Sequence, residues 1–176
     1  MKKGVPAKKI VLSGLFIAIG ILLPGITMRI PAVGNMLLPM HIPVMLLGFI
    51  CGAPYGAAAG FITPLIRSAL LSMPPMFPTA VSMAFELACY GFLCGLLYEK
   101  LPKKTIFIYV SLILAMLGGR IVWGMASLVF YTLERNAFTW QLFLSGAFLN
   151  ALPGIAIQLV LIPLTVIALK KNKLME

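Results

Sequence analysis

Acidic residues are almost absent from this chain of 176 residues. It has no aspartate and only four glutamates, which lie far apart in the sequence: Glu86, Glu99, Glu134 and Glu176. Metal-assisted chemistry on phosphates and lipids usually needs several carboxylates or histidines at one site. His41 is the only histidine, so the sequence offers neither set. These absences weigh against a membrane-embedded enzyme, and we expect no metal and no cofactor.

Other chemical motifs are missing as well. The three cysteines, Cys51, Cys89 and Cys94, are odd in number, lie in apolar segments and show no metal-ligand spacing. We expect them to be small buried side chains. The chain also lacks the P-loop pattern GxxxxGK[ST], so it cannot hydrolyse a nucleotide through that motif.

Charge of either sign is scarce, and apolar residues dominate. Hydrophobic residues make up 61% of the chain, charged residues 10%, and the mean hydropathy is +1.06. A soluble domain could not cover its surface with so few polar groups. We therefore expect an all-α polytopic membrane protein that forms a single transmembrane domain over residues 1–176. Because no small-residue cleavage site follows Leu23, the first apolar run is interpreted as a membrane helix and not as a signal peptide.

The net charge of +10 comes largely from lysines in three clusters that flank apolar runs: Lys2, Lys3, Lys8, Lys9; Lys100, Lys103, Lys104; and Lys170, Lys171, Lys173. This placement is typical of cytoplasmic loops and ends and argues against binding to nucleic acid. Six crossings put all three clusters on the cytoplasmic side, together with both termini. Five or seven crossings would separate them.

The apolar runs predict six helices, over Ile10–Leu23 (extending as far as Met28), Pro43–Gly52 (or from Met36), Tyr55–Leu71, Thr79–Tyr98, Thr105–Tyr131 and Gln141–Leu169. Prolines, with Gly34 and Asn35, break the pattern over Thr27–Pro43, which predicts a structured outer loop. Ser72–Pro78 and Thr132–Trp140 are the other predicted outer loops. The second helix is short for a span, so it must tilt or borrow length from Leu37–Ile42.

Four polar side chains lie at membrane depth in this topology. At a rise of 1.5 Å per residue, Arg67, Glu86, Asn150 and Arg120 lie roughly 8, 10, 13 and 16 Å below the outer ends of their helices. Charges at such depth are costly and usually face a partner or a cavity. We expect a cup that opens outward. Three alternatives remain: Glu86 forms a structural ion pair with Arg120 or Arg67, Arg67 extends outward to the interface, and Asn150 bonds a neighbouring helix.

Further candidate ligand contacts come from the loops and from helix five. Arg29, Asn35 and His41 lie in the first outer loop, where they are equally compatible with ordinary loop positions. Trp123 lies deeper than Tyr131 among glycines and could stack on a ring, or it could belong to an interfacial aromatic belt. Met76 belongs to a group of outer methionines that pack adaptably against irregular shapes, whether ligand or protein.

The chain resembles a known family, the substrate-binding S components of energy-coupling factor (ECF) vitamin transporters. The local runs that carry the resemblance are LPMHIPVMLLGFICG (Leu38–Gly52), YGAAAGFITPLIRSALLSMPPMFPTA (Tyr55–Ala80) and AFELACYGFLCGLLY (Ala84–Tyr98). Size, six helices and basic inner ends also agree. The likeness extends over nearly the whole chain but does not identify one vitamin.

The resemblance implies a multi-pass protein of the prokaryotic cell (inner) membrane that captures a vitamin or precursor outside. The pocket would lie at the outer ends of helices four to six and the loops after helices one and three. The S component would then dock on a membrane T component driven by two cytoplasmic ATPases, and topple to release its cargo. Gly14 and Ala18 occupy the place of the family's docking pair of small residues, whose common form is two alanines.

The ligands that fit best are pyridoxine, a hydroxymethylpyrimidine and pantothenate, because the chain is short and has few aromatic groups in the cup. A carboxylate would suit Arg67 or Arg29, and a hydroxyl or ring nitrogen would suit Glu86. Cobalamin and folate stay open, since large ligands can protrude. An autonomous proton-coupled permease with Glu86 as relay is the alternative function, although the sequence shows no internal repeat.

Overall fold

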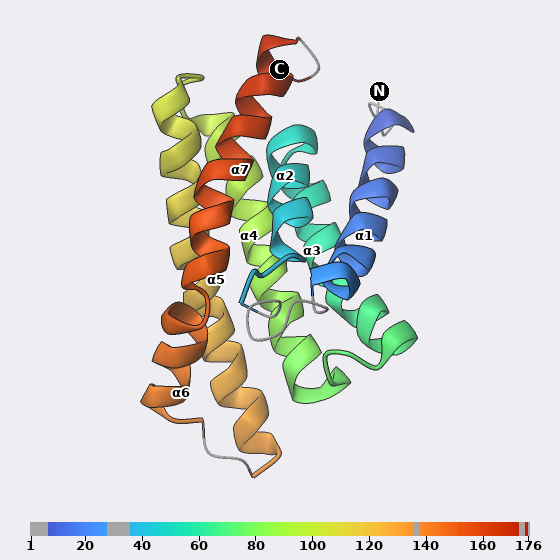
Figure 1. Cartoon of the computed structure of the whole chain (residues 1–176), viewed down its shortest axis with the longest axis vertical. Coiled ribbons are helices and arrows are strands. Elements are labelled where there is room, and N and C mark those ends of the chain that lie inside the picture. The colour runs from blue at the N-terminus through green and yellow to red at the C-terminus, as the bar shows by residue number, and fades with distance from the viewer. Residues whose placement is uncertain (1–6, 28–35, 136–137, 173–174, 176) are drawn as a thin grey trace, which may run out of the picture.

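The computed structural model describes residues 7–27, 36–135, 138–172 and 175. Two predicted site residues, Arg29 and Asn35, lie outside these ranges. Every regular element within them is a helix: α1 (Ala7–Thr27), α2 (His41–Cys51), α3 (Ala53–Leu71), η1 (Met76–Ala80), α4 (Val81–Lys100), α5 (Thr105–Leu133), α6 (Trp140–Leu144), η2 (Ser145–Leu149) and α7 (Leu152–Lys171). The helices form an upright bundle (Figure 1). The all-α prediction is thus confirmed for the described residues.

The described lysines of the three clusters gather at one end of this bundle, here called the basic end. The start of α1, the turn between α4 and α5, and the end of α7 all lie at the top of Figure 1. Two contacts join elements at this end. The ammonium of Lys170 in α7 donates to the backbone carbonyl of Lys103 in the α4–α5 turn, and the ammonium of Lys9 in α1 lies 5.4 Å from the ring centroid of Tyr55 in α3. The opposite end, here called the far end, carries α6 and the segment before α4.

Four helical segments are long and apolar enough to cross a bilayer: Ala7–Thr27, Met76–Lys100, Thr105–Leu133 and Trp140–Lys171. Helix α2 is shorter, with 11 residues, as the sequence predicts. The crossing number of six and the cytoplasmic position of the basic end stay predictions.

Close backbone contact among α2, α3 and α4 builds the centre of the bundle. A Cβ placed on Gly91 of α4 would lie 2.2 Å from the carbonyl oxygen of Gly56 in α3. A Cβ on Gly60 would lie equally close, 2.2 Å, to the carbonyl oxygen of Leu87. Small residues permit this approach, which replaces lipid contacts by dense packing between helices. The approach places the start of α2 and the end of α3 beside the first turns of α4.

The last predicted helix, Gln141–Leu169, is wrong as a single continuous α-helix. It consists of α6, the π-helical segment η2 and α7, with turn residues at Asn150 and Ala151. Pro153 lies in the first turn of α7. A proline inside a continuous helix would remove a hydrogen bond and clash with the preceding turn, so the helix restarts there. Pro78 has a similar place at the start of the fourth helix, which begins with η1 at Met76.

The helix contact at Gly91 gives a testable prediction. Replacing Gly91 by alanine should lower the free energy of unfolding by about 1–3 kcal/mol, because α3 and α4 must move apart. Thermal unfolding of the purified protein in detergent measures the effect. Gly14→Ala is the matched control, since no atom lies within 4 Å of a Cβ at that position. Equal melting temperatures for the two variants would contradict the packing described here.

Candidate functional site

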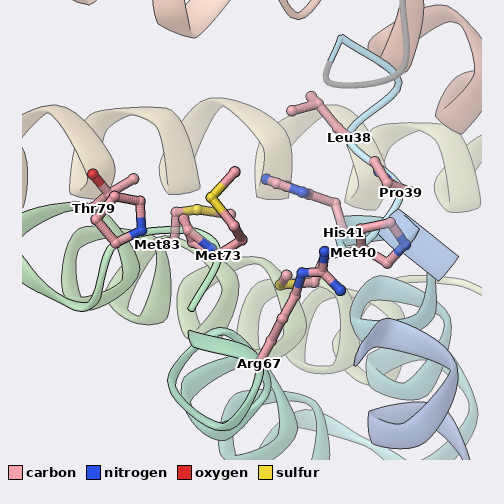
Figure 2. A pocket seen from close by; sticks show the side chains of 11 residues that line it. Leu38, Pro39, Met40, His41, Arg67, Met73, Thr79 and Met83 are labelled. Atoms are coloured by element: carbon pink, nitrogen blue, oxygen red, sulfur yellow. The ribbon is translucent and has the colours of Figure 1, made fainter. Parts of the chain in front are cut away.

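A cavity of about 370 Å³ lies toward the far end of the bundle, among α1, α2, α3 and the start of α4. We call it the far-end cavity. The described residues that line it are Pro24, Leu38, Pro39, Met40, His41, Arg67, Met73, Pro74, Pro75, Thr79 and Met83. Its walls are mainly proline and methionine side chains, with His41, Arg67 and Thr79 as polar groups (Figure 2). The cavity volume suits a small organic molecule.

His41 is the first residue of α2 and a wall of the far-end cavity. Only 2% of its surface is exposed, and neither ring nitrogen has a hydrogen-bond partner among the described residues. Its Nε2 atom lies 3.7 Å from Oε1 of Glu86, beyond hydrogen-bond distance. Buried imidazole nitrogens normally find partners, so this side chain has unused capacity to donate or accept.

Arg67 reaches the same cavity from α3 (Figure 2). Its guanidinium donates to the backbone carbonyl of Ile21 in α1, and only 4% of the residue is exposed. The side chain is therefore turned into the protein and does not extend outward to the interface. The neighbouring Ser68 hydroxyl donates to the carbonyl of Pro74 at 2.7 Å, which holds the loop before α4 against the end of α3.

Glu86 lies behind His41, at the meeting point of α2, α4 and α5. Its Oε1 atom accepts hydrogen bonds from Nη1 of Arg120 at 2.7 Å and from the hydroxyl of Tyr90 at 3.0 Å. Glu86 is 2% exposed and Arg120 is 7% exposed. Such a pair is stable at depth only when the two charges compensate each other and hydrogen bonds fill the remaining positions. The structure thus contains the ion pair weighed above as an alternative for Glu86.

Sequence reasoning missed Tyr90, Thr79 and Met83. Together with Glu86 they lie three or four residues apart across η1 and α4, a spacing that places side chains on one face of a helix. This periodicity was visible in the sequence and could have identified the whole face. Tyr90 also packs against His41, with ring centroids 5.4 Å apart. One face of α4 thus carries both a residue of the cavity wall, Met83, and the carboxylate of the ion pair, Glu86.

The other predicted site residues in the described ranges lie elsewhere. Trp123 packs against Phe138 and stacks on Phe143, at centroid distances of 5.7 and 6.1 Å. Asn150 and Met76 are exposed and are not among the lining residues of the far-end cavity. A second cavity, of about 480 Å³, lies between α5 and α6 and is lined mainly by apolar and aromatic side chains.

The predicted docking pair lies on the outside of α1. Gly14 and Ala18 are both exposed and four residues apart on the helix, and no atom lies within 4 Å of a Cβ at Gly14. The face around them is apolar and includes Val11, Leu15 and Leu22. Nothing in the described part of the chain covers it.

The far-end cavity can hold a small polar molecule between adaptable apolar walls and a few directed groups. Within the described residues, no three side chains of histidine, cysteine or acidic type come together as a metal site. The cavity borders the segment before α2, the loop after α3 and the start of α4, and its described lining contains no residue from α5, α6 or α7.

Breaking the buried ion pair should destabilise the protein strongly. Arg120→Gln leaves the Glu86 carboxylate buried without its counter-charge, which typically costs about 3–5 kcal/mol. The double variant Arg120→Gln/Glu86→Gln removes both charges and should recover much of this loss. Thermal unfolding of the wild type, both single variants and the double variant measures the coupling. Strictly additive effects would show that the two side chains do not interact.

A family model described as the ECF transporter, substrate-specific component, matches residues 8–166 of the chain. Neither the curated proteins nor the solved structures gave a significant match. The matched residues cover most of the chain and include every described residue that lines the far-end cavity. The chain therefore belongs to the family of substrate-specific components of ECF transporters.

Proposed function

We propose that the protein is the substrate-capture subunit of an ECF-type importer and binds a water-soluble vitamin or precursor in the far-end cavity. The observation that carries the proposal is His41, a buried imidazole in the cavity wall whose two ring nitrogens have no hydrogen-bond partner among the described residues, with Nε2 3.7 Å from Oε1 of Glu86. An unsatisfied buried polar group costs free energy, and a polar ligand would offset this cost. The site has the ligand-pocket character of apolar walls with few polar groups.

The chemistry of the lining favours a ligand with hydrogen-bond acceptors. Arg67 can donate only, and the charge of Glu86 is already compensated by Arg120. A ligand hydroxyl, ring nitrogen or carboxylate would face His41 and Arg67, while Met40, Met73 and Met83 would adapt to its apolar part. Pyridoxine, a hydroxymethylpyrimidine and pantothenate all satisfy this description. Arg29 and Asn35 remain proposed contacts, as do Met76, Trp123 and Asn150.

Delivery would require partners. Gly14 and Ala18 would give α1 a flat surface for close approach by a helix of the T component. Two cytoplasmic ATPases would drive the complex, consistent with the absence of a P-loop in this chain. The proposed location is the prokaryotic cell membrane, with the basic end inside. Uptake into liposomes by the chain alone would instead favour the autonomous permease.

Ligand binding by the isolated protein tests the site. The detergent-purified chain should bind one member of a vitamin panel with sub-micromolar affinity, measured by isothermal titration calorimetry. Loss of one buried hydrogen-bonding group costs about 1–3 kcal/mol, so His41→Ala should weaken binding roughly 5- to 100-fold. Mass spectrometry of small molecules that co-purify from vitamin-rich cultures would identify the ligand to titrate.

Gln141→Ala is the control for the binding test, because Gln141 is polar but exposed on α6, outside the cavity lining. Its affinity should stay within about twofold of the wild type, which corresponds to less than ~0.5 kcal/mol. Asn150→Ala separates the far-end cavity from a pocket that extends to the last helix. No binding across the panel, or equal binding by His41→Ala and the wild type, would refute the proposed site.

Docking through α1 is tested separately from binding. Ala18→Leu should reduce vitamin uptake by cells or proteoliposomes that contain the complete transporter, because the larger side chain keeps the partner helix away. The affinity of the isolated chain should not change. Ala69→Leu is the matched control, since Ala69 is exposed on α3. Unchanged uptake for Ala18→Leu, or an equal loss for both variants, would place the docking surface elsewhere.

A further inference from the structure

Gln158 in α7 is a buried polar residue with an unused hydrogen-bond donor. Only 1% of its surface is exposed, and its amide nitrogen Nε2 has no hydrogen-bond partner among the described residues. Buried side-chain amides normally find partners. The residues at four-residue spacings along α7 are buried as well: Gly154, Ile162 and Val166. Gln158 therefore lies on the face of α7 that is turned toward the bundle.

Helix α2 is the neighbour on this face. Helices α2 and α7 are in contact, and both run from the far end toward the basic end (Figure 1). Near the far end, the backbone N–H of Gly154 donates to the carbonyl of Met36 at 3.0 Å, and a Cβ on Gly154 would lie 2.8 Å from the carbonyl carbon of Leu37. Toward the basic end, one hydrophobic cluster contains residues of both helices: Met45, Phe49, Ile162 and Val166.

These contacts set the register between the two helices. One step of four residues back from Met45 leads to His41, and the same step back from Ile162 leads to Gln158. Because both helices rise by about 1.5 Å per residue in the same direction, equal steps lead to the same level. The contact of Gly154 bounds this level on the other side. The register therefore places Gln158 beside His41.

His41 and Gln158 are thus two buried polar side chains with unused hydrogen-bonding atoms at one level of neighbouring helices. Neither ring nitrogen of His41 has a hydrogen-bond partner among the described residues, and Nε2 lies 3.7 Å from Oε1 of Glu86, whose charge is compensated by Arg120. The amide nitrogen of Gln158 can only donate, and an imidazole N–H donates as well. Together the two side chains offer two hydrogen bonds to one acceptor.

We propose that Gln158 is a second ligand-binding residue, which donates together with His41 to an oxygen acceptor at the buried end of the ligand. The proposal rests on the proposed function, since the ligand reaches His41 through the far-end cavity. A hydroxyl or carbonyl oxygen has two lone pairs and accepts both bonds, whereas an ammonium group accepts neither. The site therefore takes a ligand with an oxygen acceptor at this end and excludes one that ends in a primary amine.

Side-chain rotation completes the site. Gln158 is not among the residues that line the far-end cavity, whereas His41 is. The imidazole ring must therefore turn for the ligand oxygen to lie between the two side chains. Rotamer changes of this kind are common when a partner binds. A buried water molecule could occupy the same donors instead. In that case the amide of Gln158 would not affect the affinity for the ligand.

Isothermal titration calorimetry of the full chain in detergent tests the proposal, with pyridoxine, a hydroxymethylpyrimidine and pantothenate as probes. Gln158→Met keeps the length of the side chain and removes the donor. It should weaken binding of the probe that the wild type binds by roughly 5- to 100-fold. The melting temperature without ligand should stay equal or rise, because an unpartnered buried group has been removed. A purely structural role would lower it.

Ser111→Ala is the matched control. The hydroxyl of Ser111 is also buried and has no hydrogen-bond partner among the described residues, but Ser111 lies in the second turn of α5, near the basic end. Its affinity should stay within about twofold of the wild type. The double variant His41→Ala/Gln158→Met should lose less than the product of the two single losses, since both residues donate to one acceptor.

Equal affinity of Gln158→Met and the wild type would overturn the proposal and leave the proposed function intact. A loss of affinity that comes with a lower melting temperature would also overturn it, because the amide would then support the fold. If the wild type binds none of the three probes, the ligand role of Gln158 fails together with the proposed function. The two failures are thus distinguished by the wild-type titration.

Discussion

The structure depends on a compensated charge at the centre of the bundle. The Glu86 carboxylate is held by Arg120 and Tyr90, at 2.7 and 3.0 Å. In a membrane neither charge is stable alone, because there is no water to solvate it. The pair therefore ties α4 to α5 more specifically than apolar packing can. His41 lies beside this pair, with its Nε2 atom 3.7 Å from Oε1 of Glu86.

The position of His41 follows from the shortness of α2. Because α2 has only 11 residues, it leaves room beyond its first turn, toward the far end. The segment directly before it, Leu38–Met40, forms part of the cavity wall. Close contact through Gly56, Gly60 and Gly91 brings α3 against α4, so that Arg67 approaches the same cavity from the other side. Backbone packing at the centre of the bundle thus determines which polar side chains meet toward the far end.

The sequence alone predicted the helices and their shared basic end, because hydropathy and lysine placement respond directly to the membrane. Of the four polar residues that it placed away from the helix ends, Arg67, Glu86 and Arg120 are buried in the structure, whereas Asn150 is exposed. The sequence could not say which of them meet, since depth along a helix does not determine the direction in which a side chain points. Arg67 and Arg120 were equal candidates as partners of Glu86, and the rotation of α5 decides for Arg120. Asn150 is exposed in the turn between η2 and α7, a break that the apolar pattern of the last helix conceals.

Charge compensation also limits how this protein can recognise a ligand. With Glu86 engaged by Arg120, the strongest negative group near the far-end cavity is already occupied, so recognition must come from neutral or donating groups and from shape. Methionine and proline walls define a volume with little chemical selectivity, since methionine adapts to many outlines. In the proposed site, specificity would rest on how few acceptors fit opposite His41 and Arg67. The family can therefore be recognised from the sequence, whereas the identity of the proposed ligand depends on side-chain directions that only the folded bundle sets.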